Sequence, residues 1–302
     1  MFKKVKRYLQ DPYYSLGSDL INKHPRWMSD KFYLSVLWKM VMGYEIDWEH
    51  PKTFNEKLQW LKLNNRIPQY TTLVDKYRVK PWVEDIIGRQ HVVPTLAFYD
   101  SVNDIDLSVL PNQFVLKCNH DSGSVVICKN KDSFDLDAAK KKLGKALERN
   151  FYWEVREWPY KNVKPCVFAE KYLEDESGGL TDFKVSCFNG VPYKVMVCLD
   201  RYSSEPTKFY SFDKDWKLLR HNKMGKAAPE GFSLPKPRNF DKMIEYSALL
   251  SKGIPFVRVD FYEAGGVLFF GELTFFPEGG FDKAILKETD TLYGEMIKLP
   301  KC

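Results

Sequence analysis

The sequence lacks a hydrophobic run long enough to cross a bilayer. Its most apolar window, Phe32 to Gly43, is only about a dozen residues long and contains Lys39. The basic start of the chain is followed by no apolar stretch, so we expect no secretion signal. The six cysteines include no C-x-x-C pair, and internal repeats and low-complexity segments are absent. We therefore expect a cytoplasmic protein with reduced, buried thiols, without disulfides or a zinc site.

Neither sign of charge dominates the chain. Lysine and arginine number 46 against 40 acidic residues, the two signs are interspersed, and the net charge is +6. This balance favours an anionic ligand such as a nucleotide, an acidic sugar or a membrane surface, and does not indicate a nucleic-acid binder. A length of 302 residues with 44% apolar content predicts one large domain or two closely joined ones. The basic start suits either a membrane-surface helix or an ordinary solvated helix; its cations are Lys3, Lys4, Lys6 and Arg7.

The stretch from Phe256 to Gly280 predicts two strands joined by a hairpin. Apolar and polar residues alternate along the first strand, and Ala264-Gly265-Gly266 suits a tight turn. Asp260 interrupts the apolar pattern of the first strand and Glu272 that of the second. Burying an unpaired carboxylate costs several kcal/mol, so each needs a cation or several hydrogen-bond donors. If the strands pair around the turn, the two carboxylates lie near each other.

Two interpretations of these carboxylates remain open from spacing alone. With Thr274 two residues after Glu272, they form an all-oxygen set suited to Mg²⁺. Alternatively, Asp260 pairs with Arg258 or another base, and Glu272 lies at a solvated edge, since structural ion pairs mimic such sites.

The order R-V-D, a Gly-containing turn, G-E-L-T and P-x-G-G resembles the metal-binding end of the ATP-grasp fold. More narrowly, the chain from about Thr53 to Pro300 resembles the TupA-like ATP-grasp family of bacterial polysaccharide gene clusters. The resemblance implies that Asp260, Glu272 and Thr274 hold Mg²⁺ on the phosphates of ATP, with Thr274 where most relatives have Asn. It also implies an α+β ATP-grasp fold, in which two α/β subdomains with antiparallel sheets grip ATP. The expected division is an N-terminal helical region (1–72), an N-terminal lid subdomain (73–168) and a C-terminal subdomain with the metal site (169–302).

Residues 114–129, F-V-L-K-C-N-H-D-S-G-S-V-V-I-C-K, predict two strands around a small polar loop. Such a loop can lay backbone N–H groups over phosphates, although one glycine is no phosphate fingerprint. By resemblance this is the ATP-grasp lid hairpin, with Lys117 as a phosphate contact. The same resemblance makes Lys76, on a helix predicted from Leu73 to Ile87, the first ATP-contacting lysine. The loop residues assigned to ATP in this way are His120, Ser122, Gly123 and Ser124.

The string Glu170-Lys171-Tyr172-Leu173 ends a strand predicted from Cys166. Taken alone, Glu-Lys is a surface pair. In ATP-grasp enzymes a similar string is the hinge beside adenine, and a backbone-lined cleft suits a purine. The resemblance therefore assigns these four residues to ATP. Lys184, on the next strand, is either a phosphate contact or a surface residue.

The resemblance implies an ATP-dependent carboxylate–amine ligase that acts through an acyl phosphate, with ATP and Mg²⁺ as cofactors. Lys117 and Arg258 are the catalytic candidates, Arg258 holding the γ-phosphoryl group or the acyl phosphate. The expected substrates are a carboxylated sugar or small molecule and an amine or amino acid. They belong to cell-surface polysaccharide synthesis (capsule, O-antigen or teichuronopeptide-like), with peripheral contact to membrane-bound machinery at the inner face.

Two alternatives belong to other classes of protein. One is a glycosyltransferase, for which Asp104-Ile105-Asp106 is a formal D-x-D motif. The other is a non-catalytic nucleotide-binding module. A further basic region is suited to an anionic acceptor; it contains Arg201, Lys208, Arg220 and His221.

Overall fold

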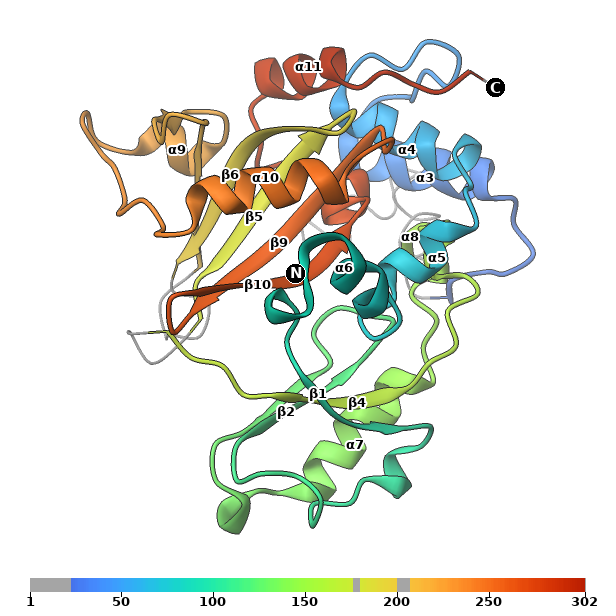
Figure 1. Ribbon diagram of the computed structural model, residues 1–302. Helices are drawn as coiled ribbons and strands as arrows, with labels where there is room; N and C mark the ends of the chain where they lie inside the picture. Colours follow the sequence, from blue (N-terminus) through green and yellow to red (C-terminus); the bar gives the residue numbers. More distant parts are fainter. Residues whose placement is uncertain (1–22, 176–179, 200–206, 302) are drawn as a thin grey trace, which may run out of the picture.

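The computed structural model describes residues 23–175, 180–199 and 207–301. Helices pack on two antiparallel sheets, a four-stranded one with the order β1-β4-β2-β3 and a six-stranded one with the order β10-β9-β5-β6-β7-β8 (Figure 1). This arrangement confirms the predicted α+β class. Four features of the sequence analysis lie wholly or partly outside the described residues: the basic start, part of the loop after the hinge string, Arg201 and Cys302.

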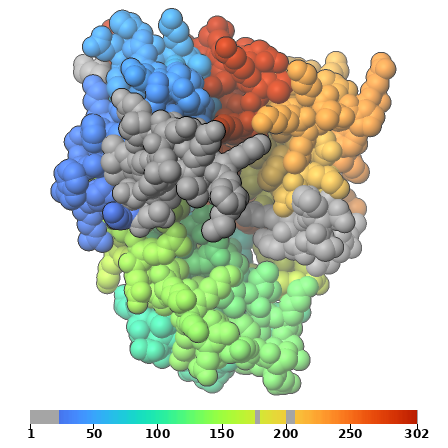
Figure 2. All heavy atoms as spheres, turned by 180° about the vertical axis from the view of Figure 1, so that it is seen from behind, coloured from blue at the N-terminus to red at the C-terminus, as the bar shows by residue number. Residues whose placement is uncertain are grey.

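One face of the small sheet is covered by a single helix. It contains β1 (Thr95–Tyr99), β2 (Phe114–Cys118), β3 (Val125–Cys128) and β4 (Val167–Lys171), with helix α7 (Leu136–Leu147) beside it. Along β2, alternate residues are buried against α7, and the residues between them face the other way. Seen from behind, this unit forms the lower, green part of the molecule (Figure 2).

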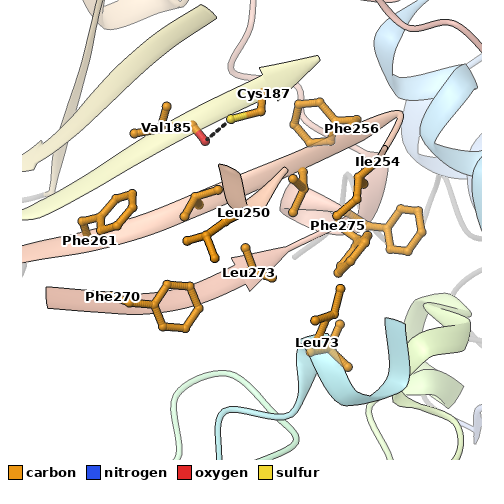
Figure 3. Packing of buried hydrophobic residues seen from close by; sticks show 14 of the residues in the cluster. Leu73, Val185, Cys187, Leu250, Ile254, Phe256, Phe261, Phe270, Leu273 and Phe275 are labelled. Carbon is orange, nitrogen blue, oxygen red and sulfur yellow. Dashed lines mark hydrogen bonds between the residues drawn. The ribbon is translucent and has the colours of Figure 1, made fainter. Parts of the chain in front are cut away.

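One face of the large sheet packs into the main hydrophobic core. Its strands are β5 (Asp182–Phe188), β6 (Val191–Leu199), β7 (Lys208–Phe212), β8 (Leu218–Leu219), β9 (Phe256–Ala264) and β10 (Val267–Thr274). Val185 and Phe261 of this sheet lie in the main core with Leu250 of helix α10 (Phe240–Leu250) (Figure 3), and Val259 belongs to the same core. The Asn189-Gly190 turn between β5 and β6 has positive φ at both residues, as its sequence predicts.

The remaining helices lie around the two sheets. The α-helices are α3 (Asp30–Met42), α4 (Phe54–Asn64), α5 (Gln69–Val74), α6 (Val79–Ile87), α8 (Tyr152–Val155), α9 (Lys223–Ala227) and α11 (Lys287–Met296). Short 3₁₀ turns are η1 (Arg89–His91), η2 (Val102–Asp104), η3 (Lys131–Ser133), η4 (Trp158–Tyr160) and η5 (Pro277–Gly280). Helix α4 begins with the predicted capping box, in which Thr53 and Glu56 bond each other's backbone N–H groups.

The helix predicted over 73–87 is wrong, because two helices flank a break at residues 75–78. The carboxylate of Asp75 accepts hydrogen bonds from the N–H groups of Tyr77 and Arg78, at 3.0 and 2.9 Å. These bonds precede the first turn of α6, which begins as a separate helix. The backbone N–H of Lys76 donates to the carbonyl of Asn119 instead of continuing α5. Pro81 lies in the first turn of α6, where a proline is tolerated.

The expected subdomain boundary between residues 168 and 169 falls inside β4. Because β4 pairs with β1 and β2, we propose that the chain changes subdomain only after Lys171. The cysteines of the described ranges are all free and buried: Cys118, Cys128, Cys166, Cys187 and Cys198. Within those ranges, no helix combines the length and the apolar character needed to span a membrane.

Candidate active-site cleft

A cavity of about 370 Å³ is lined by residues of both sheets. Its lining includes ten of the residues that the sequence analysis assigned to ATP or metal: Lys76, Lys117, Ser122, Gly123, Glu170, Lys171, Tyr172, Leu173, Lys184 and Glu272. A larger hollow, of about 550 Å³, lies between β3 and α7 and contains none of the predicted site residues. The chemistry is therefore concentrated in the smaller cavity.

A β-bulge at Gly271 brings the two hairpin carboxylates together. Phe270 pairs with Phe261, but the register then shifts so that Glu272 lies opposite Asp260. In a regular register without the bulge, Gly271 would oppose Asp260, and Glu272 would oppose Val259 with its side chain on the core face. A Cβ at position 271 would lie 2.9 Å from the Tyr262 ring, so a larger residue would force that ring to move. The predicted proximity of Asp260 and Glu272 is confirmed.

Asp260 is held by two cations. Its side chain is 1% exposed, and Arg258 donates from Nε and Nη2 to its two oxygens at 2.6 and 2.7 Å. The Lys184 Nζ lies 2.5 Å from Oδ2. Burial by itself would lower the pKa of Arg258, but Asp260 and then Glu272 hold it above its ordinary value. The pairing of Asp260 with Arg258, one of the two alternatives open from the sequence, is therefore present.

Glu272 faces the cavity and is paired less tightly. Its carboxylate lies 3.1 Å from the Lys76 Nζ and 3.6 Å from Arg258, and its side chain is 31% exposed. Burial would raise the pKa of Glu272, but the charges of Lys76, Arg258 and Lys184 hold it well below its usual range. Glu272 therefore stays ionised.

The predicted Mg²⁺ ligands differ in whether they face the cavity. Asp260 and Glu272 both carry the carboxylate oxygens that this ion prefers, but only Glu272 lines the cavity, whereas both oxygens of Asp260 are bonded to Arg258 and Lys184. The Thr274 hydroxyl accepts a hydrogen bond from Arg258 at 3.0 Å and points to Glu272 at 3.5 Å, so it is already engaged. In the described part of the chain, no three His, Cys, Asp or Glu side chains are grouped to hold a metal by themselves. The phosphates of a nucleotide would have to complete the coordination.

The break between α5 and α6 positions Lys76 at the same end of the cavity. Its Nζ donates to the carbonyl of Asp121 at 2.6 Å, besides contacting Glu272. Lys76 thus joins the lid loop to the hairpin, from a loop rather than from the predicted helix.

Two of the loop residues assigned to ATP point elsewhere. His120 is buried and its Nε2 lies 3.1 Å from the carbonyls of Ala146 and Arg149. The Ser124 hydroxyl bonds the carboxylate of Asp121. Neither residue is part of the cavity lining, whereas Ser122 and Gly123 are. Of the loop residues assigned to ATP, only Ser122 and Gly123 at the tip therefore line the cavity.

At the other end of the cavity, Glu170 lies between two lysines. Lys117 and Lys80 each place Nζ 2.6 Å from one of its oxygens, although the side chain of Glu170 is only 7% exposed. Burial opposes ionisation of Glu170, but Lys117 and then Lys80 lower its pKa. Beside it, the N–H of Lys171 donates to the carbonyl of Pro94 at 3.0 Å.

Sequence reasoning missed three residues whose charges or contacts reach residues of the site, although Glu157 and Tyr160 lie outside the cavity lining. Lys80, on α6, gives no signal in the sequence, because nothing local shows that it meets Glu170. Glu157 and Tyr160 lie in an aromatic stretch, residues 151–160, that is typical of core packing. Burial raises the pKa of Tyr160 well above its usual value, and the charges of Glu157 and Glu272 add to that effect. A glutamate inside an aromatic run was the one available signal.

The D-x-D motif and the described basic residues Arg220 and His221 make their contacts within the protein, away from the cavity. The Asp106 carboxylate accepts a hydrogen bond from the N–H of Ser108 in a loop, and the D-x-D motif lies outside the cavity lining. The guanidinium of Arg220 donates to backbone carbonyls, and His221 Nδ1 lies 2.8 Å from the Tyr293 hydroxyl. The structure therefore uses Arg220 and His221 internally.

Comparisons with known proteins point to one family. A family model described as TupA-like ATPgrasp matches residues 56–298, and no curated protein matches the chain. Among solved structures, a D-alanine–D-alanine ligase from Bacillus anthracis is 19% identical, with a TM-score of 0.43 over 75% of this chain and 64% of that chain. For the same ligase from Helicobacter pylori the values are 14%, 0.43, 81% and 69%. For the D-cycloserine synthetase DcsG they are 15%, 0.44, 80% and 77%. The chain thus spans less than two thirds of the Bacillus anthracis ligase.

Proposed function

The chain belongs to the TupA-like ATP-grasp family, and from this premise we propose that it is an ATP-dependent carboxylate–amine ligase. The family and the ATP-grasp fold expected from the sequence are thereby confirmed. In the proposed reaction, a substrate carboxylate attacks the γ-phosphorus of ATP and ADP leaves. The amine nitrogen then attacks the acyl carbon of the acyl phosphate, and inorganic phosphate leaves.

The observation that carries this proposal is the row of ion pairs between the two sheets. Three of the five lysines that line the cavity are balanced by carboxylates of the chain: Lys117 by Glu170, Lys76 by Glu272 and Lys184 by Asp260. A triphosphate would compete for the lysines, and a divalent metal would compete for Glu272. Binding both together therefore exchanges partners without leaving a buried charge unmatched.

The residues have separate roles in this proposal. Lys76, Lys117 and Lys184 bind the phosphates, and the backbone from Lys171 to Leu173 faces the adenine. Arg258, held rigidly by Asp260, orients the transferred phosphoryl group. Glu272 would hold Mg²⁺, which when bound neutralises the triphosphate and polarises the γ-phosphoryl group. Asp260 would join Glu272 on the ion only by giving up its contact with Lys184.

The substrate class is a finer proposal that rests on the resemblance to the family of polysaccharide gene clusters. We infer a carboxylated sugar as the acceptor and an amino acid or amine as the donor. The protein would then act in the cytoplasm, in contact with membrane-bound polysaccharide machinery.

Thermal melts with nucleotides and turnover assays test this proposal. We expect ATP with Mg²⁺ to raise the melting temperature, and ADP release to require both a uronic acid and an amine from a substrate panel. A response to nucleotide sugars with Mn²⁺ instead would indicate a glycosyltransferase. ATP binding without ADP release under any combination of a broad panel would favour a non-catalytic nucleotide-binding module.

A further inference from the structure

Three hydrogen-bond donors form a row across the large sheet, next to the cavity wall. Ser186 of β5 lies opposite Arg258 of β9 on one side and opposite Lys194 of β6 on the other. Residues directly opposite each other in antiparallel strands have Cα atoms about 4.5–5.5 Å apart. Arg258, Ser186 and Lys194 therefore form one row, with Ser186 in the middle, and we call it the donor row. The proposed reaction has so far used only Arg258.

The donor row lies on the same face of the sheet as the cavity. The residues next to it along the three strands, Val185, Val195 and Val259, are fully buried in the main core. Because successive side chains of a strand alternate, the donor row lies on the opposite face. Lys184 shares that face, lines the cavity and precedes Ser186 by two residues. The donor row is therefore about 7 Å along the strands from the row of Lys184.

Lys194 is an ammonium group without a countercharge in contact. Its Nζ lies 5.0 Å from the centre of the Tyr293 ring. Within residues 23–175, 180–199 and 207–301, no hydrogen bond or ion pair reaches that nitrogen. Burial lowers the pKa of Lys194 to about 8; Asp282 opposes this effect and Arg258 adds to it. The carboxylate of Asp282 accepts a hydrogen bond from the N–H of Ala284 at 2.8 Å.

The other two members of the donor row also have hydrogen-bonding capacity left. Arg258 donates from Nε and Nη2 to Asp260, and from Nη2 to Thr274. Across the described residues, neither Nη1 of Arg258 nor the hydroxyl of Ser186 has a hydrogen bond, and neither is one of the fully buried polar atoms without a partner. Both atoms therefore keep some exposed surface at which a ligand can bind.

The chemistry of the donor row suits a carboxylate. Its members offer N–H and O–H groups, and a carboxylate accepts hydrogen bonds at both of its oxygens. The row contains no acid, so a metal ion or an ammonium group would find no countercharge in it. The neighbouring row consists of Lys184, Asp260 and Glu272, where the phosphates and Mg²⁺ of the proposed function bind. A carboxylate on the donor row would therefore lie beside the phosphoryl group that it has to attack.

We propose that Lys194 and Ser186 bind the carboxylate of the acceptor substrate, beside the phosphoryl group that Arg258 orients. This proposal rests on the proposed ligase function and assigns its first substrate to a subsite. One carboxylate oxygen accepts the hydrogen bonds of Lys194 and Ser186. The other oxygen attacks the γ-phosphorus, and ADP leaves as the new P–O bond forms.

The test compares wild type with Lys194→Met, which keeps an unbranched apolar side chain and removes the charge. Lys194→Arg keeps a positive charge, and Ser186→Ala removes the hydroxyl while Lys194 stays in place. Lys217→Met is the matched control, because Lys217 is exposed beside β8 of the same sheet.

Acetate and D-glucuronate are the anionic probes, and acetamide and D-glucuronamide are their neutral counterparts. Ligand-observed NMR titrations measure the affinity for each probe, with and without the non-hydrolysable complex Mg·AMP-PNP. Calorimetry measures the affinity for Mg·AMP-PNP itself.

We expect wild type and Lys217→Met to bind both anions more tightly than the corresponding amides. Lys194→Met should bind the anions more weakly by about tenfold or more, because a charge-assisted hydrogen bond has been removed. Lys194→Arg should recover most of this loss, and Ser186→Ala should show a smaller loss. All four variants should bind Mg·AMP-PNP as wild type does.

Several results would overturn the subsite. They are equal anion binding by wild type and Lys194→Met, no anion binding by wild type, or equal binding of the anions and their amides. Much weaker binding of Mg·AMP-PNP by Lys194→Met would overturn it too, because Lys194 would then be a nucleotide contact. If Lys194→Met does not fold, Ser186→Ala decides, and wild-type anion affinity in that variant would refute the subsite. Failure of Mg·AMP-PNP to bind wild type would instead count against the ligase function, while the anion titrations without nucleotide still report on Lys194.

Discussion

Both sheets present a buried carboxylate clamped by two cations, but the two clamps are built differently. On the large sheet, Asp260 lies directly opposite Lys184 in the strand register, and Arg258 is two residues away on the same strand. Strand pairing alone brings these three groups together. On the small sheet, Glu170 meets Lys117 from the adjacent strand and Lys80 from helix α6.

The two clamps also differ in how well water reaches them. The Glu170 side chain is 7% exposed and its partner Lys117 22%, whereas Asp260 is 1% exposed and its partners Lys184 and Arg258 are 10% and 14% exposed. A charge near water can find another partner when its first one leaves, and a sealed charge cannot. The comparison suggests that Asp260 keeps Arg258 and Lys184 fixed on the large sheet. On the small sheet, Lys117 can exchange Glu170 for a phosphate.

The largest effect should come from breaking the sealed clamp. Asp260→Asn leaves Arg258 and Lys184 buried without their full countercharge, so we expect a loss of about 3–5 kcal/mol of unfolding free energy. Glu170→Gln should cost less, because Lys117 can turn to solvent. Urea unfolding of both nucleotide-free variants measures the difference, and an equal or larger cost for Glu170→Gln would refute the distinction between the clamps.

We expect an intermediate effect on ATP affinity when Lys117 of the small-sheet clamp is removed. Lys117→Ala should weaken ATP binding by roughly ten- to a hundredfold, since a charge-assisted phosphate contact contributes about 1.5–3 kcal/mol. Lys141→Ala removes the same charge from an exposed position on helix α7 and should leave the affinity unchanged. Calorimetric titration of ATP with Mg²⁺ decides the matter. Unchanged affinity in Lys117→Ala would exclude it from the phosphate site.

A third effect concerns the pH dependence of stability at Glu157, which belongs to neither clamp and shows how an unclamped carboxylate behaves. Its pKa is raised from 4.5 to about 7 in the folded protein, so the folded state keeps a proton that the unfolded state releases. Wild type should therefore lose stability relative to Glu157→Gln as the pH rises from 4.5 to about 7, and the gap should then level off. Calorimetric melting temperatures across this range test the sign. A gap that shrinks with rising pH would mean that Glu157 gains a partner on folding.

Several features of the site follow from local patterns in the sequence. The Gly265-Gly266 turn and the alternation along β9 predicted the hairpin, and the pairing then brought Asp260 near Glu272. The family resemblance supplied Lys117 and the string from Glu170 to Leu173, which line the cavity. These predictions succeed because turn residues and side-chain alternation act over a few neighbouring positions.

The sequence by itself determined the strands, the turns, the capping box and the family, because each depends on residues close together in the chain. Only the tertiary structure decided where Lys76, Lys80 and Glu157 lie. The helix predicted through Lys76 is interrupted in part because Asp75 also bonds the side chain of Asn119, 44 residues away, at 2.7 Å. Lys80 finds Glu170 only when α6 packs beside β4, and Glu157 lacks a cation only because Lys62 is taken by other segments. Contacts between distant segments depend on how whole elements pack, and no local pattern of residues encodes them.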